Sequence, residues 1–507
     1  MKGASVIRML HAVVGEDAFF EGLRSYMRAF RYGNATTNDL WKCLEAASDQ
    51  KVAEIAGDWT RQQGFPLLTL EKMGASTNGR VRIVLRQEWY QADGSSVGKE
   101  EAKLWTVPVF VASSQAEEAA GEAAANGTPG KPLLKLMPRF PNVTFSVPCD
   151  GRWLKLNAGQ SVPMRVKYPD DMIPRLAEAM RARALPPVDR IGLISDASSI
   201  CRAGKLDPAL YLELLSTCED EVDPIVLCQS FERMAGLAGL LGTASAVGAA
   251  FAKFVASMLS PQLAQLGWVP APSDGHLTRK LRATVLNLLP QFCRHDPEVC
   301  SEARRRFGAF VADPSGAAAH LELPSELQAP VFSLVLSSGG EAEFNSLLNL
   351  YDEPNVDVAT KARALAALGD APTAALRARA LELTVTSNRV KAQDIALVPA
   401  AVHGASDDGR QAAWDFFKAH HEQYQARAGG GLSNLMDGLI AACCGRFCTE
   451  AQRADVAAFF EANPFPKNAK KIATLLEEMA TSTKYLNYLV SGGSLLSWLD
   501  RRASTSF

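Results

Sequence analysis

Histidine is the residue type that most often holds a catalytic zinc ion, and this chain has seven: His11, His276, His295, His320, His403, His420 and His421. A hydrolytic zinc site needs two histidines one helical turn apart and a nearby carboxylate, so that three ligands converge and a fourth position stays open for water. The corresponding HExxH pattern does not occur, and His421-Glu422 comes nearest to it without a second histidine. The sequence therefore predicts no hydrolytic zinc site in this chain.

Cysteine supplies two weaker patterns. Cys293, His295 and Cys300 form C-x-H-x4-C, and Cys443, Cys444 and Cys448 lie together near the end of an expected helix. Neither has the paired CxxC spacing of structural zinc sites, so buried thiols in helices are the favoured interpretation.

Other catalytic and phosphate-binding patterns are also missing. The sequence contains no GxSxG nucleophile elbow, no GxxxxGK[ST] phosphate loop and no GxGxxG after a strand. Gly429 to Gly431 joins two helical segments and is interpreted as a hinge or turn. We accordingly predict no catalytic, cofactor-binding or metal-binding residue in this chain.

The composition is that of an ordinary globular protein of several domains. The 507 residues exceed what one core usually holds, and 53 basic against 55 acidic side chains give a net charge of −2, which disfavours nucleic acid as a partner. The ten cysteines are too sparse for a disulfide scaffold. No stretch approaches the ~18 apolar residues of a membrane span, and no signal peptide is visible. These features favour a cytoplasmic protein without membrane contact.

The hydrophobic pattern changes twice along the chain. Residues 1–64 have helical periodicity, with a capping box at Thr36 and Asp39 and a C-cap expected at Gly64. Residues 65–169 alternate as short strands and predict a small β-sandwich, with a surface loop over Ser113 to Lys131. The expected strands are Leu68 to Leu70, Val81 to Leu85, Leu104 to Val111, Val143 to Val147, Trp153 to Leu156 and Met164 to Val166.

Residues 170–507 are helical again, so the fold class is mostly α with a small β-sandwich. Four dipeptides predict helix starts, because each puts a capping side chain before a proline: Asp207-Pro208, Asp223-Pro224, Ser260-Pro261 and Asp296-Pro297. Paired helices in series without an exact repeat indicate an irregular HEAT/armadillo-like α-solenoid. Such a stack curves and forms a concave surface.

Several segments resemble, in order, the aminopeptidase N and puromycin-sensitive aminopeptidase family of zinc metallopeptidases. These are Lys2 to Leu10, Tyr32 to Thr37, Trp59-Thr60, Gly64 to Pro66, Trp153 to Gln160, Asp189 to Leu193 and Tyr211 to Leu214. The family pattern places before the first segment a tyrosine that hydrogen-bonds the oxyanion, and here it would fall one residue before Met1. One departure is Val162-Pro163-Met164, where the family has a glycine and aromatic residues, which leaves the local turn open.

The resemblance implies three parts. Residues 1–64 would be the helical end of a thermolysin-like catalytic domain, 65–169 the β-sandwich and 170–507 the helical C-terminal domain. Zinc would belong to the intact parent enzyme, which removes N-terminal residues from peptides, and this chain alone would be inactive.

A second hypothesis is a non-enzymatic helical-repeat module that binds peptides or proteins. The side chains of Phe19, Phe20, Phe30 and Trp59 discriminate between the two, because a protein adapted to stand alone would not expose them. Exposure favours a fragment of the peptidase, with faces in residues 1–64 that could self-associate, and burial favours the stand-alone module.

Overall fold

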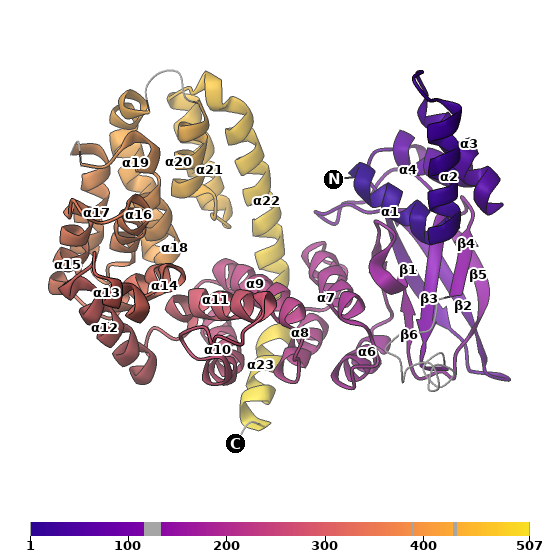
Figure 1. Cartoon of the computed structure of the whole chain (residues 1–507), viewed down its shortest axis with the longest axis horizontal. Helices are drawn as coiled ribbons and strands as arrows, with labels where there is room; N and C mark the ends of the chain where they lie inside the picture. Colours follow the sequence, from indigo (N-terminus) through magenta and orange to yellow (C-terminus); the bar gives the residue numbers. More distant parts are fainter. Residues whose placement is uncertain (1, 116–132, 387–388, 429–432, 506–507) are drawn as a thin grey trace. The chain divides into compact units, whose positions relative to one another are not determined.

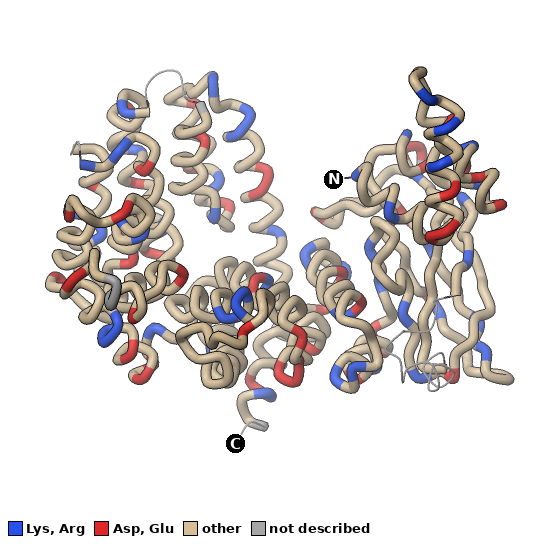
Figure 2. The backbone as a smooth tube through the Cα atoms, viewed as in Figure 1, with Lys and Arg blue, Asp and Glu red and all other residues tan. Residues whose placement is uncertain are grey.

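The structure is a computed structural model that describes residues 2–115, 133–386, 389–428 and 433–505. It divides into two compact units, Met1–Val226 and Leu227–Phe507. Helices dominate both, and a small two-sheet region lies in the first (Figure 1). Basic and acidic residues are interspersed along the elements of each unit (Figure 2).

The first unit opens with four helices: α1 (Lys2–Val14), α2 (Glu16–Ala29), α3 (Thr37–Ser48) and α4 (Val52–Arg61). The predicted capping box is confirmed, since the Thr36 amide donates to the Asp39 carboxylate at 2.9 Å. The prediction of Gly64 as a C-cap is wrong, because α4 already ends at Arg61 with Gln62 as its cap. Gly64 instead has a φ of 83°, and a Cβ there would lie 2.1 Å from Nε1 of Trp89, so the turn into the sheet requires glycine.

The strands form two sheets with the orders β5-β2-β1-β7 and β4-β3-β6. They are β1 (Pro66–Met73), β2 (Arg80–Trp89), β3 (Val107–Ser113), β4 (Leu133–Met137), β5 (Asn142–Pro148), β6 (Leu154–Leu156) and β7 (Arg165–Lys167). All pairings are antiparallel except β1 with β7, where Leu67 is in register with Arg165.

Strand β4 is the one described strand that the sequence pattern missed. It lies at a sheet edge, and only Met137 of its side chains is fully buried, so it lacks the strict alternation of a half-buried strand. The predicted surface loop over Ser113 to Lys131 falls, apart from its first three residues, outside the described residues.

Helices make up the rest of the chain. The first unit adds α6 (Met172–Arg181), α7 (Pro187–Arg202) and α8 (Pro208–Ser216). The others are α9 (Pro224–Leu241), α10 (Ala246–Leu266), α11 (His276–Phe292), α12 (Pro297–Ala312), α13 (Ala317–Glu322), α14 (Ser325–Ser337), α15 (Glu341–Asp352), α16 (Val358–Ala367), α17 (Ala374–Thr386), α18 (Leu397–Ala405), α19 (Asp407–Arg427), α20 (Ser433–Cys444), α21 (Glu450–Ala462), α22 (Ala469–Ser491) and α23 (Ser494–Thr505).

Three of the four predicted helix starts are confirmed. The carboxylates of Asp207, Asp223 and Asp296 each accept a hydrogen bond from the amide two residues on, at 2.8 to 2.9 Å.

The fourth is wrong: Pro261 lies inside α10, whose N-cap is Ser245. The Ser260 hydroxyl donates back to the Ala256 carbonyl instead of capping, and the helix continues through the proline with one amide donor fewer.

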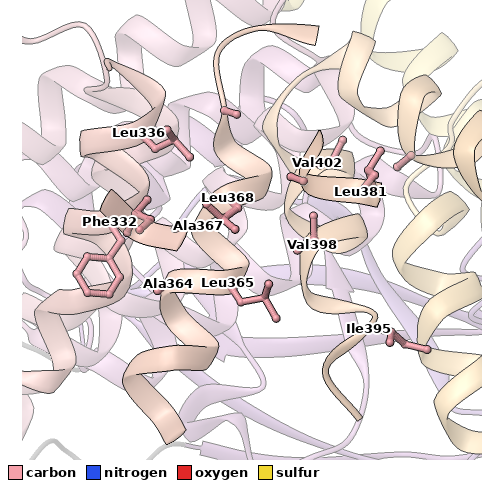
Figure 3. Packing of buried hydrophobic residues seen from close by; sticks show 14 of the residues in the cluster. Phe332, Leu336, Ala364, Leu365, Ala367, Leu368, Leu381, Ile395, Val398 and Val402 are labelled. Atoms are coloured by element: carbon pink, nitrogen blue, oxygen red, sulfur yellow. The ribbon is translucent and has the colours of Figure 1, made fainter. Parts of the chain in front are cut away.

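One apolar cluster occupies much of the second unit. It runs from Leu286 on α11 to Met479 on α22. Figure 3 shows labelled side chains from α14, α16, α17 and α18 gathered in it, together with Leu368. Because these helices present broad apolar faces to one another, hydrophobic burial is the main stabilising term of this unit.

Candidate functional site

The first cysteine-histidine pattern does not converge in the structure. Cys293 and Cys300 are buried, whereas His295, between them in sequence, is exposed. The Cys300 thiol donates to the Arg294 carbonyl at 3.1 Å. Burial raises the pKa of Cys293 to about 11, which disfavours the thiolate that a metal requires.

The second cysteine pattern is equally unsuited to metal binding. The thiols of Cys444 and Cys448 donate to different carbonyls, those of Ile440 and Leu240. Burial raises the pKa of Cys444 to about 12. All ten cysteines lie within the described ranges, where none forms a disulfide.

The donor set therefore does not fit zinc. Across residues 2–115, 133–386, 389–428 and 433–505, no three His, Cys, Asp or Glu side chains are grouped so that they could hold a metal ion. The glycine run Gly429 to Gly431, predicted to be a hinge, lies outside the described residues.

The structure instead brings together charged residues in the interior of the first unit. Lys155 on β6 lies with its Nζ 3.6 Å from Oδ1 of Asp189 on α7, and both side chains are buried. The Lys155 ammonium also donates to the Leu156 carbonyl at 2.5 Å. Sheet and helix are thus joined through an ion pair rather than through apolar contact alone.

Gly159 is the backbone residue that links Asp189 to α1. Its amide donates to Asp189 at 2.9 Å, and its carbonyl accepts from the Arg8 guanidinium of α1 at 3.0 Å. Its φ of 74° favours glycine. We call Arg8, Lys155, Gly159 and Asp189 the joint, since they connect α1, the sheet region and α7.

Neighbouring contacts fix the same elements. The Asn157 side chain accepts from the Val162 amide at 3.1 Å and donates to the Val162 carbonyl at 3.0 Å, which closes the turn that the sequence left open. Gly192 on α7 lets Gln160 approach, because a Cβ at that position would lie 1.9 Å from Gln160 Nε2.

Two further ion pairs hold α7 in place, one partly buried and one fully buried. Arg165 on β7 lies 3.1 Å from Asp196, which also accepts from the Val166 amide at 3.2 Å. Arg190 makes a two-pronged contact with Glu221 at 2.7 and 2.8 Å. Helix α7 therefore has charged contacts on several sides.

Burial shifts the pKa of three of these groups toward the neutral form. It raises the pKa of Asp189 and of Asp196, and it lowers the pKa of Lys155, while the opposite charges counteract each shift. Each charge needs its partner, because a single one left in the interior is strongly destabilising. The arrangement suits precise positioning of helices, and it presents no nucleophile or acid–base pair to a substrate.

In the sequence, Trp153 to Gln160 and Asp189 to Leu193 contribute only to the family resemblance. Their contact with each other was not predicted. No clear signal was present, because Lys155 between two leucines fits the alternation of a half-buried strand, and Asp196 lies among serines.

Of the four aromatic residues whose exposure discriminates between the two hypotheses, two are buried and two are at least partly exposed. Trp59 is fully buried, its ring packs beside Trp105, and its Nε1 donates to the Thr106 carbonyl at 3.0 Å. Phe19 is also buried, whereas Phe20 is 46% exposed and Phe30 is partly exposed. The expected apolar face is thus present but confined to part of residues 1–64.

The protein is mostly helical with a small two-sheet region, and in its first unit the joint links α1, strand β6 and helix α7. Residues 153–481 match the family described as the ERAP1-like C-terminal domain, and residues 1–59 match the Peptidase family M1 domain. The first match covers more than half of the chain, and the chain belongs to the ERAP1-like C-terminal domain family.

Similar proteins are aminopeptidases by name. Aminopeptidase M1-B of Oryza sativa subsp. japonica is 28% identical over 502 residues, 97% of this chain and 54% of the relative. The puromycin-sensitive aminopeptidase of Caenorhabditis elegans is 28% identical over 461 residues, 90% of this chain and 46% of the relative. The chain spans about half the length of the curated relatives it matches. Within the described part, none of the helices has the length and apolar character needed to cross a bilayer.

Proposed function

We propose that this chain is the C-terminal portion of a zinc-dependent aminopeptidase that removes N-terminal residues from peptides. The observation that carries the proposal is the joint. Arg8, from the segment that matches the Peptidase family M1 domain, and Asp189, from the segment that matches the ERAP1-like C-terminal domain, hold the same residue, Gly159. Matches to aminopeptidases along nearly the whole chain favour this function over a stand-alone binding module.

The contribution of the joint is to position α1. In the family pattern, a tyrosine that hydrogen-bonds the oxyanion precedes the segment that Lys2 to Leu10 resembles. The exposed Arg8 holds α1 to the Gly159 carbonyl by a hydrogen bond, and the buried Lys155–Asp189 pair holds β6 and α7 on either side of Gly159. The zinc and its ligands belong to the parent enzyme outside these residues, and no step of the reaction is assigned to this chain.

The helices of residues 170–507 would serve peptide binding and closure over the active site as an irregular HEAT/armadillo-like solenoid. Residues 1–64 would be the end of the catalytic domain and residues 65–169 a β-sandwich. A cytoplasmic location fits the ten cysteines without disulfides. Exposed apolar side chains in residues 1–64 also support self-association.

The test has two readouts on the purified chain. Elemental analysis should find no stoichiometric zinc, and aminoacyl-coumarin substrates should not be hydrolysed above the buffer rate, with or without added zinc. A fluorescently labelled peptide pool should show saturable binding by anisotropy.

A full-length family M1 aminopeptidase assayed in parallel serves as the positive control. Zinc-dependent hydrolysis by the chain would overturn the assignment of the catalytic residues to the parent. Absence of saturable peptide binding would overturn the peptide-binding role.

A further inference from the structure

Helix α23 packs against α10, which lies more than 200 residues earlier in the chain (Figure 1). The Trp498 ring meets the Phe254 ring edge to face, with the centroids 5.3 Å apart. Leu495 and Leu499, one helical turn apart, are buried, whereas most of the other described side chains of α23 are partly or fully exposed. The contact of α23 therefore depends mainly on one narrow stripe of three side chains.

This contact lies outside the apolar cluster that runs from Leu286 to Met479. The match to the ERAP1-like C-terminal domain ends at residue 481, and the buried Tyr485 and Leu489 farther along α22 are not members of the cluster. Helix α10 contributes partly buried side chains to the cluster, namely Ala256 and Leu263, whereas its buried side chains are not members: Phe251, Phe254, Val255, Met258 and Leu259. Loss of α23 would therefore leave that cluster intact.

Helix α10 is held at both ends by groups other than α23. Just before the helix, the Asp407 carboxylate of α19 accepts hydrogen bonds from the amides of Thr243 and Ala244, each at 3.3 Å. At the other end, the Arg282 guanidinium of α11 donates to the Leu266 carbonyl at 2.9 Å. Helix α10 can therefore keep its place when α23 leaves it.

Two glycines form the turn between α22 and α23. Gly493 has a φ of 65°, whereas Gly492 has a φ of −91°. A Cβ at either position would meet nothing within 4 Å, so neighbouring groups do not crowd this turn. Because α23 has only 12 residues, it is marginal as an isolated helix, and its order depends on docking.

We propose that α23 is a detachable clasp, which docks on a preformed face of α10 and leaves it as one unit, with Gly492 and Gly493 as the pivot. The docked clasp joins the end of α22 to α10 and covers Phe254. The released clasp uncovers this face while the rest of the second unit stays folded. The proposal does not depend on the peptidase function, since it uses only contacts within the second unit.

The experiment is hydrogen exchange of the full chain, read at single residues by mass spectrometry with electron-transfer fragmentation. The amides from Trp498 to Ser504 should share one opening constant, about 100-fold or more above that of amides in α14, α16 and α18. Fraying would instead give protection that decreases steadily toward Ser504. Graded protection, or protection as high as that of α14, would overturn the proposal.

Two glycine variants leave every packing side chain in place and test the pivot. Gly493→Ala should raise the opening constant of α23 about tenfold, because an L residue is strained in the left-handed conformation. Gly492→Ala is the matched control and should not raise it, since its φ suits any residue. Equal effects of the two substitutions would contradict the assigned pivot.

Trp498→Ala tests whether the face of α10 is preformed. Loss of the ring contact with Phe254 should raise the opening constant of α23 at least about tenfold. The amides of α10 and of α14 should keep their protection within about twofold, because other contacts hold these helices. Acceleration of the α10 amides as large as that of α23 would show that α10 depends on α23, and the clasp would not be detachable.

Discussion

The two units of the molecule bury their surfaces by different means. The buried Asp189, Asp196 and Glu221 lie in the first unit, whereas the second unit buries the arginines Arg282, Arg306 and Arg410. Much of the second unit is occupied by an apolar cluster that spans α11 to α22. Apolar packing stabilises but tolerates rearrangement, whereas a buried ion pair is costly unless its geometry is satisfied. Directional contacts between charged groups therefore fix the segments of the first unit, whereas a large apolar core stabilises the second.

The largest expected effect comes from breaking the joint. Lys155→Met leaves Asp189 buried beside fewer donors, and removal of one partner of a buried ion pair typically costs about 3 to 5 kcal/mol. We expect hydrogen exchange of β6 and α7 amides to accelerate accordingly, while amides of the second unit keep their protection.

The control for that variant is Lys72→Met, which removes an exposed lysine from β1. It should change the free energy of unfolding by less than about 0.5 kcal/mol. If Lys155→Met and Lys72→Met change the free energy of unfolding equally, the buried ion pair stabilises the first unit no more than an exposed lysine does.

A smaller effect concerns the buried histidine of the second unit. Burial, together with the nearby Arg410 and Arg446, lowers the pKa of His403 from 6.5 to about 4. Because the folded state then binds fewer protons than the unfolded state, stability is complete above pH 6.5 and is lost as the pH falls toward 4. The loss amounts to about 3 kcal/mol and is measured by urea denaturation across this pH range.

His403→Gln provides the matched control, since its side chain can accept a hydrogen bond but does not titrate. Its stability should depend less steeply on pH between 6.5 and 4 than that of the parent chain. An unchanged slope would show that other groups cause the acid sensitivity of the second unit.

The smallest effect tests whether polar bonds matter in the apolar core. The hydroxyls of Tyr424 and Thr384 lie 2.6 Å apart, and Thr384 also donates to the Leu381 carbonyl. Tyr424→Phe therefore leaves no unsatisfied donor and should cost only about 1 kcal/mol in thermal unfolding. If Tyr424→Phe lowered the stability as much as Lys155→Met does, buried polar contacts would be equally important in both units.

Much of the fold could be predicted from residue pattern because local rules governed it. The capping box at Thr36 and the aspartate caps before Pro208, Pro224 and Pro297 depend on neighbours within four residues. Pro261 was misread because the same dipeptide also fits inside a helix when the apolar pattern continues around it. Strand β4 was missed because edge exposure weakens its alternation.

The joint could not be predicted, because its members come from three distant segments. Arg8 and Gly159 are 151 residues apart, and Gly159 and Asp189 are 30 apart. Lys155 between two leucines fits the alternation of a half-buried strand, so the sequence pattern indicates neither its burial nor its partner. The exposure of Phe20 beside the burial of Phe19 is likewise decided by which face of α2 meets α3, and periodicity alone does not choose between two adjacent aromatic residues.

The parallel pairing of β1 with β7 has a consequence for biosynthesis. Leu67 to Thr69 pair with Arg165 to Lys167, so the first sheet is not complete until that later segment has left the ribosome. Until then one edge of β1 offers unpaired backbone groups to any neighbouring chain. A ribosome that stalls between the two strands would release an aggregation-prone nascent chain, and chaperone demand should be greatest over this stretch of translation.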